Sequence, residues 1–203
     1  MILYGASGHG KVIAEILEAN NIYDIIFWDD NNTARVFEFR IFKPFENIID
    51  QKMIISIGSN TVRKKIAEKT GEQFTFATAT HPNAIISRRC IIGEGSVIMP
   101  GAIINADSTI GRHAIINSGA VIEHDCTLDD FIHVSPNATL CGNISVGQGT
   151  HIGAASVIKQ GINIGKWCTI GAGAVIIRDI PDYAVVVGNP GKIINYIQPN
   201  NNI

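Results

Sequence analysis

Aliphatic residues recur at every sixth position from Ile86 to Ile176 without a slip. A period of six fits neither an α-helix, with 3.6 residues per turn, nor a coiled coil, with 3.5. The pattern therefore predicts a repeating β architecture. The sixteen positions are Ile86, Ile92, Ile98, Ile104, Ile110, Ile116, Ile122, Leu128, Val134, Leu140, Val146, Ile152, Ile158, Ile164, Ile170 and Ile176.

A second, mostly small residue stands four places after each aliphatic one, as at Ala102, Ala120 and Cys126. Each hexapeptide is then predicted to form a short strand and a bend, with both positions facing inward. Glycine often follows the aliphatic residue, as at Gly93 and Gly111, where we expect the bend.

This repeat resembles that of the hexapeptide transferases, whose left-handed parallel β-helix uses 18 residues for each three-sided coil. The resemblance implies about five coils for the sixteen repeats here, and a prism about 25 Å long at the usual strand spacing. Residues 81–203 are predicted to form this β-helix. The tail from Pro181 is predicted to close the last coil and to contribute to the coenzyme site.

Before the repeat, apolar runs alternate with helical stretches, which predicts a small Rossmann-like α/β domain over residues 1–80. The predicted strands are Ile2–Tyr4, Ile25–Trp28, Met53–Ile57 and Phe74–Phe76, and the predicted helices are Lys11–Asn20 and Thr61–Lys69.

Three loops of this domain leave the carboxyl ends of strands, where open α/β sheets bind ligands. The first is a glycine-rich turn that includes Ser7, Gly8 and His9 and suits a phosphate group. It misses the P-loop pattern at Val12, which excludes an ATPase of that class, and it is not GxGxxG, so a nicotinamide cofactor is a weak option. The other two loops are Asp29-Asp30 and Gly58-Ser59-Asn60. We expect a nucleotide here, while the alternative is ordinary turns and helix caps.

Composition narrows the partners. The chain has 203 residues and a formal net charge of −2 with no basic run, so neither nucleic acid nor an anionic membrane is expected. No apolar stretch approaches the roughly 20 residues of a membrane-spanning helix and no signal sequence opens the chain, so a cytoplasmic protein is expected. Four widely spaced cysteines without a CxxC pair predict reduced thiols, and three of them occupy the small inward position.

His124 stands between Glu123 and Asp125 on a predicted turn, and a carboxylate beside an imidazole makes it a better general base. A solvated surface pair is the alternative. The surrounding residues, Asn117 to Cys126 with Phe131–Ser135 and Cys141–Asn143, resemble the PglD-like branch of hexapeptide transferases. So do the Gly-Ala-Ser-Gly-His-Gly turn and Val187–Pro190. That branch contains nucleotide-linked amino-sugar N-acetyltransferases and sialic-acid O-acetyltransferases.

The resemblance implies roles for particular residues. His124 would be the general base, supported by Asp125, where the family often has Glu. Asn117 would position the reacting groups, and the Gly142 N–H would stabilise the oxyanion. His133 would lie near the acetyl group of acetyl-CoA. The remaining implied contacts are Ala154 and Ala172 with the pantetheine arm, and Ser7, Gly8, His9, Asp29, Asp30 and Gly58 with the nucleotide sugar.

His133 and His151 lie 18 residues apart and should stack, yet no third ligand for a metal is evident, so no metal is expected. The other expected partner is a second and third copy of the chain, since the family resolves its exposed apolar faces by forming homotrimers. The function predicted is acetyl-CoA-dependent N-acetylation of a nucleotide-linked amino sugar for surface glycan synthesis. O-acetylation of a sugar such as sialic acid and a non-catalytic scaffold are the alternatives.

Overall fold

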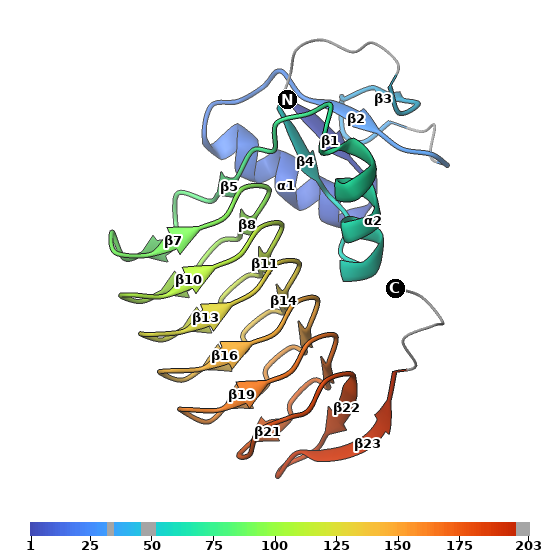
Figure 1. Cartoon of the computed structure of the whole chain (residues 1–203). Coiled ribbons are helices and arrows are strands. Elements are labelled where there is room, and N and C mark those ends of the chain that lie inside the picture. Colours follow the sequence, from blue (N-terminus) through green and yellow to red (C-terminus); the bar gives the residue numbers. More distant parts are fainter. Residues whose placement is uncertain (32–34, 46–51, 198–203) are drawn as a thin grey trace.

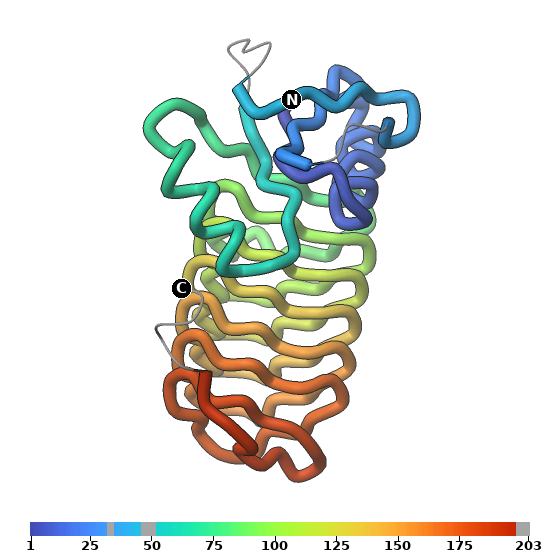
Figure 2. Tube along the Cα trace, turned by 90° about the vertical axis from the view of Figure 1, so that its right-hand side faces the viewer, coloured from blue at the N-terminus to red at the C-terminus, as the bar shows by residue number. Residues whose placement is uncertain are grey.

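The structure is a computed structural model that describes residues 1–31, 35–45 and 52–197. A small α/β unit sits at one end of a long solenoid of stacked coils (Figure 1). Seen from the side, α2 runs down along the first coils, so the two parts share a long boundary (Figure 2).

The α/β unit has a four-stranded parallel sheet in the order β3-β2-β1-β4. Side chains of alternate strand residues point to opposite faces. Leu3, Phe27 and Ile54 pack with α1, while Ile2 and Trp28 pack with α2. The elements are β1 Ile2–Tyr4, α1 Gly8–Ala19, β2 Ile26–Trp28, β3 Ile41–Phe42, β4 Met53–Ile55 and α2 Asn60–Thr70.

The sequence predicted both helices to within three residues at each end. It missed β3, and the predicted strand Phe74–Phe76 forms only an isolated bridge, between Phe76 and Met53. The division near residue 80 stays a prediction, although β5 (Ala79–Thr80) already pairs with β8 of the solenoid.

The solenoid has three faces, and along most of its length the partner strands lie 18 residues apart, as where His133 pairs with His151. We name the faces by their outward side chains. The histidine face contains β5 Ala79–Thr80, β8 Val97–Ile98, β11 Ile115–Ile116, β14 His133–Val134, β17 His151–Ile152, β20 Thr169–Ile170, β22 Ala184–Val187 and the antiparallel β23 Lys192–Tyr196.

The aliphatic face contains β6 Ile85–Ile86, β9 Ile103–Ile104, β12 Val121–Ile122, β15 Thr139–Leu140, β18 Val157–Ile158 and β21 Val175–Ile176. The hydroxyl face contains β7 Ile91–Ile92, β10 Thr109–Ile110, β13 Thr127–Leu128, β16 Ser145–Val146 and β19 Asn163–Ile164. The predicted β-helix is confirmed. The predicted five coils match only the shortest face, because the sequence count began at Ile86 and ended at Ile176 and so omitted β5 and β22.

Corners between the faces follow a strict rule. From residue 95 to residue 173, every sixth residue has a positive φ, whether it is glycine, as at Gly119, or not, as at Asp125. The glycines that directly follow the aliphatic residues, which we expected at the bends, serve another purpose. A Cβ on Gly111 would lie 2.5 Å from the Asp129 carbonyl carbon, so these glycines permit close stacking of coils.

Candidate active site

The glycine-rich loop lies at the carboxyl end of β1, between the ends of β2 and β4. Gly10 must lack a side chain, because a Cβ there would lie 2.4 Å from the Gly5 carbonyl oxygen. Gly8, in contrast, has no heavy atom within 4 Å of that position and is exposed. Ser7 precedes α1 as its N-cap without a side-chain capping bond. Exposed backbone at the start of a helix is thus available to an anion.

The paired aspartates support this loop from the end of β2. The Ala6 N–H donates to Asp29 Oδ2 at 2.8 Å. Asp30 Oδ2 accepts a hydrogen bond from the Tyr4 hydroxyl at 3.0 Å. Burial and that hydrogen bond both raise the pKa of Tyr4, so it remains a donor. Asp29 therefore shapes the loop, while the exposed Asp30 borders the crevice.

His9 is largely enclosed, and its Nε2 has no hydrogen-bond partner among the described residues. Burial, assisted by the charge of Arg63, lowers its pKa to about 4. The imidazole is therefore neutral at ordinary pH, with a polar atom available to a ligand.

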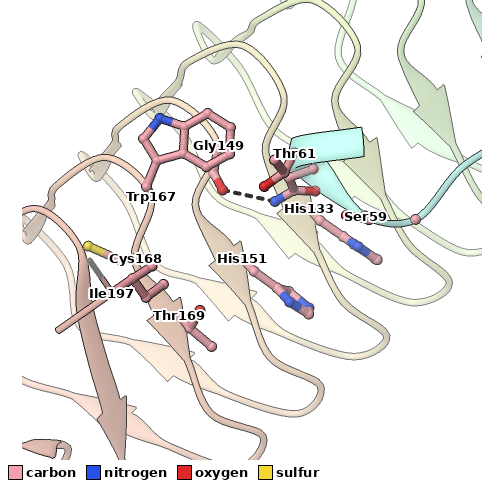
Figure 3. Close-up of a pocket in the computed structure, with 11 residues that line it drawn as sticks. Ser59, Thr61, His133, Gly149, His151, Trp167, Cys168, Thr169 and Ile197 are labelled. Atoms are coloured by element: carbon pink, nitrogen blue, oxygen red, sulfur yellow. Dashed lines mark hydrogen bonds between the residues drawn. The ribbon is translucent and has the colours of Figure 1, made fainter. Parts of the chain in front are cut away.

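A cavity of about 470 Å³ opens between α2 and the histidine face (Figure 3). Gly58 and the start of α2 line one side, and His133, His151 and Trp167 line the other. The rings of His133 and His151 stack with centroids 4.8 Å apart and an interplanar angle of 12°. The predicted stacking of this pair is confirmed.

Each stacked histidine is held by a polar residue that follows a histidine-face strand. Asn117 Nδ2 lies 3.1 Å from His133 Nε2, and Ser135 Oγ lies 2.7 Å from His151 Nε2. The pKa of His133 falls to about 3, chiefly through burial and then through the nearby His151 and Arg63. A neutral His133 accepts or donates a hydrogen bond but carries no charge into the cavity.

His124 and Asp125 lie at a different corner, exposed to solvent. His124 Nδ1 is 2.7 Å from Asp125 Oδ2, and that hydrogen bond raises the pKa of the imidazole. The left-handed backbone of Asp125, with φ of 60°, brings its carboxylate back to the ring. The His124 ring rests on Gly142, where a Cβ would lie 2.6 Å from the ring carbon Cε1. A depression of about 400 Å³ is lined by His124, Gly142 and residues of the next coil.

Two family models match the chain: the PglD N-terminal domain over residues 1–70 and the bacterial transferase hexapeptide (six repeats) over residues 89–124. The acetyltransferase domain of PglB from Neisseria gonorrhoeae is similar in structure, with a TM-score of 0.91 and 37% identity, covering 95% of this chain and 98% of that one. Perosamine N-acetyltransferase from Caulobacter crescentus, solved with CoA and GDP-perosamine, has a TM-score of 0.91, 33% identity and 96% coverage of both chains. This chain belongs to the PglD-like family of hexapeptide-repeat sugar acetyltransferases.

Another relative in this PglD-like family is the UDP-N-acetylbacillosamine N-acetyltransferase of Bacillus subtilis. It is 44% identical over 116 residues, a match that covers 48% of this chain. The match spans about half the length of that relative, at 50%.

Within one PglD-like chain the predicted residues form two separate groups. Asn117 follows β11 at the corner between the histidine and aliphatic faces, which we call the Asn117 corner. Ala154 and Ala172 lie on the same edge, after β17 and β20. His124, Asp125 and Gly142 lie at the corner between the aliphatic and hydroxyl faces, the His124 corner. The aliphatic face separates the two groups.

Sequence reasoning missed two residues of α2, Asn60 and Arg63, which tie the helix to the solenoid. Asn60 Nδ2 donates to the Gly149 carbonyl at 3.0 Å (Figure 3). A signal was present, since Arg63 falls on the same helical stripe as Ile66 and Ala67.

Two searches of the described ranges complete the site. Within residues 1–31, 35–45 and 52–197, no group of three or more His, Cys, Asp or Glu is placed to hold a metal ion. In the same ranges, no helix is both long enough and apolar enough to cross a membrane.

Proposed function

We propose that this chain transfers the acetyl group of acetyl-CoA to the amino group of a nucleotide-linked amino sugar. The observation that carries the proposal is the exposed His124–Asp125 pair, which lies against backbone on a solenoid that also bears a crevice suited to a nucleotide. Relatives support the substrates: one was solved with CoA and GDP-perosamine, and the PglB domain was also solved with acetyl coenzyme A.

The reaction needs little beyond a base and a polarised carbonyl. The sugar amine attacks the thioester carbonyl carbon, a C–N bond forms, the C–S bond breaks, and CoA leaves as the thiolate. His124 takes the proton from the attacking nitrogen, and Asp125 stabilises the imidazolium that results. The Gly142 N–H is assigned to the oxyanion, next to the ring of His124.

The nucleotide sugar is assigned to the crevice at the carboxyl ends of β1, β2 and β4. Ser7 and Gly8 offer backbone to phosphate, and His9, Asp30 and Gly58 border the same space. Asp29 contributes by holding the loop through Ala6. Coenzyme is assigned to the Asn117 corner, where Ala154 and Ala172 follow His133 along the solenoid.

A homotrimer is part of the proposal, and the three faces differ in a way that supports it. The outward positions of the aliphatic face are Ile85, Ile103, Val121, Thr139, Val157 and Val175. Those of the hydroxyl face beyond Ile91 are Thr109, Thr127, Ser145 and Asn163. Ile85 is 65% exposed and Val157 is 38% exposed. Packing the aliphatic face against neighbouring copies would bury this surface and bring the His124 corner of one chain to the Asn117 corner of the next.

The test is release of CoA thiol from acetyl-CoA with a panel of UDP- and GDP-linked 4-amino sugars, together with free and CMP-linked sialic acid. Turnover on an amino sugar that falls about 10²- to 10⁴-fold in His124→Ala supports the proposal. Turnover only on sialic acid would make the chain an O-acetyltransferase. Absence of turnover on every acceptor, with intact coenzyme binding, would favour a scaffold. We place the reaction in the cytoplasm, which agrees with four free cysteines.

A further inference from the structure

Arg63 is a buried cation that the proposed mechanism does not use. Its side chain is 1% exposed, on the face of α2 that meets the solenoid. Among the described residues, its hydrogen bonds go to carbonyl and amide oxygens and none goes to a carboxylate. Burial lowers its pKa to about 9, which still leaves it charged at neutral pH. A buried charge without a counterion is costly to hold, so its position calls for a reason.

The hydrogen bonds of Arg63 reach in two directions. One guanidinium nitrogen donates to the carbonyls of Ile57 at 3.0 Å and Gly58 at 3.2 Å. The other donates to those of Phe131 at 3.0 Å and Ile132 at 3.3 Å. Its Nε donates to the carbonyl of His113 at 2.8 Å, one coil earlier on the solenoid.

Both ends of this bridge adjoin groups of the candidate site. Gly58 belongs to the loop at the end of β4, which borders the nucleotide crevice. Phe131 and Ile132 directly precede His133 in β14. The Gly58 backbone also hydrogen-bonds the His133 ring, so the loop and the ring share a contact beside the guanidinium.

We infer that Arg63 is a positioning residue that couples the nucleotide loop to the strand bearing His133, and so sets the distance between acceptor sugar and acetyl group. This inference rests on the proposed function of the site. It explains the choice of arginine, because a planar fork with five N–H donors can bond carbonyls on both sides at once. A lysine would retain the charge but present three donors from a single nitrogen.

The design separates geometry from charge. Arg63→Lys keeps the cation and loses the fork, whereas Arg63→Met loses both. Lys65→Met is the matched control, because Lys65 lies two residues further along the same helix and is exposed. Each variant is first checked for folding by circular dichroism and for assembly by sedimentation. If Arg63→Met does not fold, Arg63→Lys carries the test.

Two measurements follow. In steady-state kinetics, we expect Arg63→Lys to lower kcat about 10- to 100-fold while both KM values stay within about threefold, since each substrate still binds but the two are misaligned. In amide hydrogen exchange, we expect faster exchange in residues 57–59 and 131–133 together. Lys65→Met should change neither.

Three outcomes would overturn the inference. One is a folded Arg63→Lys variant with kcat within about twofold of wild type. Another is a rise in KM alone, because that indicates lost binding rather than lost alignment. The third is faster exchange in only one of the two segments. If the wild type turns over no acceptor, the proposed function fails, and the exchange experiment by itself decides whether Arg63 couples the segments.

Discussion

His124 holds its carboxylate partner in open solvent, which makes its basicity depend on one short hydrogen bond. Both side chains of the pair are more than half exposed, at 62% and 58%. Burial therefore contributes little, and Asp125 is the main cause of the raised pKa of His124. The shorter carboxylate at this position, where relatives often have Glu, reaches the ring because of its left-handed backbone.

Replacing Asp125 with Asn should lower both the pKa of His124 and the rate. A general base works in its neutral form, so kcat/KM rises with pH through the pKa of that base. Without the carboxylate this rise should move to lower pH, and the plateau should fall roughly tenfold because the base is weaker. The measurement is kcat/KM against pH for wild type and Asp125→Asn. An unchanged profile would show that Asp125 does not tune the base.

Buried neutral histidines should make the protein lose stability in mild acid. The pKa of His9 and that of His113 are each lowered to about 4, mainly by burial and then by Arg63, against about 6.5 in the unfolded chain. Between these values the unfolded state binds more protons, so the free energy of unfolding falls as pH falls from about 6.5, and it levels off below about 4. Each group contributes up to about 1.4 kcal/mol per pH unit.

Urea unfolding between about pH 7 and about pH 5, at constant protein concentration, measures this slope. His113 stacks on Phe131 with ring centroids 5.1 Å apart, and it can be changed without touching the candidate catalytic residues. His113→Gln should give a shallower slope than wild type. Parallel slopes would mean that His113 does not contribute to the acid sensitivity.

At the scale of the elements, the turn from β1 into α1 contains two glycines that the structure treats differently. Gly10→Ala would push a Cβ into the Gly5 carbonyl and against the Phe27 ring, 3.0 Å away. We expect it to destabilise the fold by about 1–3 kcal/mol. Gly8→Ala meets nothing and should fold normally, yet it should weaken UDP or GDP binding by placing a methyl group where phosphate approaches. Thermal melting and calorimetric titration distinguish the two, and equal melting temperatures would contradict the contrast.

The strands of the solenoid could be predicted because each inward side chain leaves a mark every six residues. The pattern failed where the chain departs from it. Thr80 replaces an aliphatic residue in β5, and Val186 pairs with Ile170 after 16 residues instead of 18. The left hand of the β-helix came only from the family resemblance, since no period encodes it.

The site was predicted less completely, for a physical reason. His124 and Asp125 are neighbours in sequence, so their pairing could be predicted locally. Arg63 lies 50 or more residues from its solenoid partners, and only the docking of α2 brings them together. Ser135 and His151 likewise meet only because the coils stack.

At the scale of the whole molecule, the separation of the two corners predicts that active sites form between chains. Mixing inactive His124→Ala and Asn117→Ala chains, unfolded and refolded together, should restore activity. With random trimers, about a quarter of the sites would receive both intact residues. Activity that stays at the level of the separate variants would place the complete site within one chain.

A charge on the aliphatic face should prevent this assembly. Val157→Lys places an ammonium group at an outward position of that face, and we expect a folded monomer without activity. Thr127→Lys, on the hydroxyl face, is the matched control and should remain trimeric. Sedimentation at micromolar concentration makes the comparison. A trimeric Val157→Lys would mean that another surface holds the copies together.

The 18-residue stacking also limits how such a chain can change in length. Removing six residues upstream of His133 would rotate all later positions by one face, so His133 and His151 would point away from α2. Removing a full coil would keep every azimuth and only lower the remaining residues by one step along the axis. Insertions and deletions that preserve the site are therefore quantised in units of one coil, or else confined to loops that bulge from a corner.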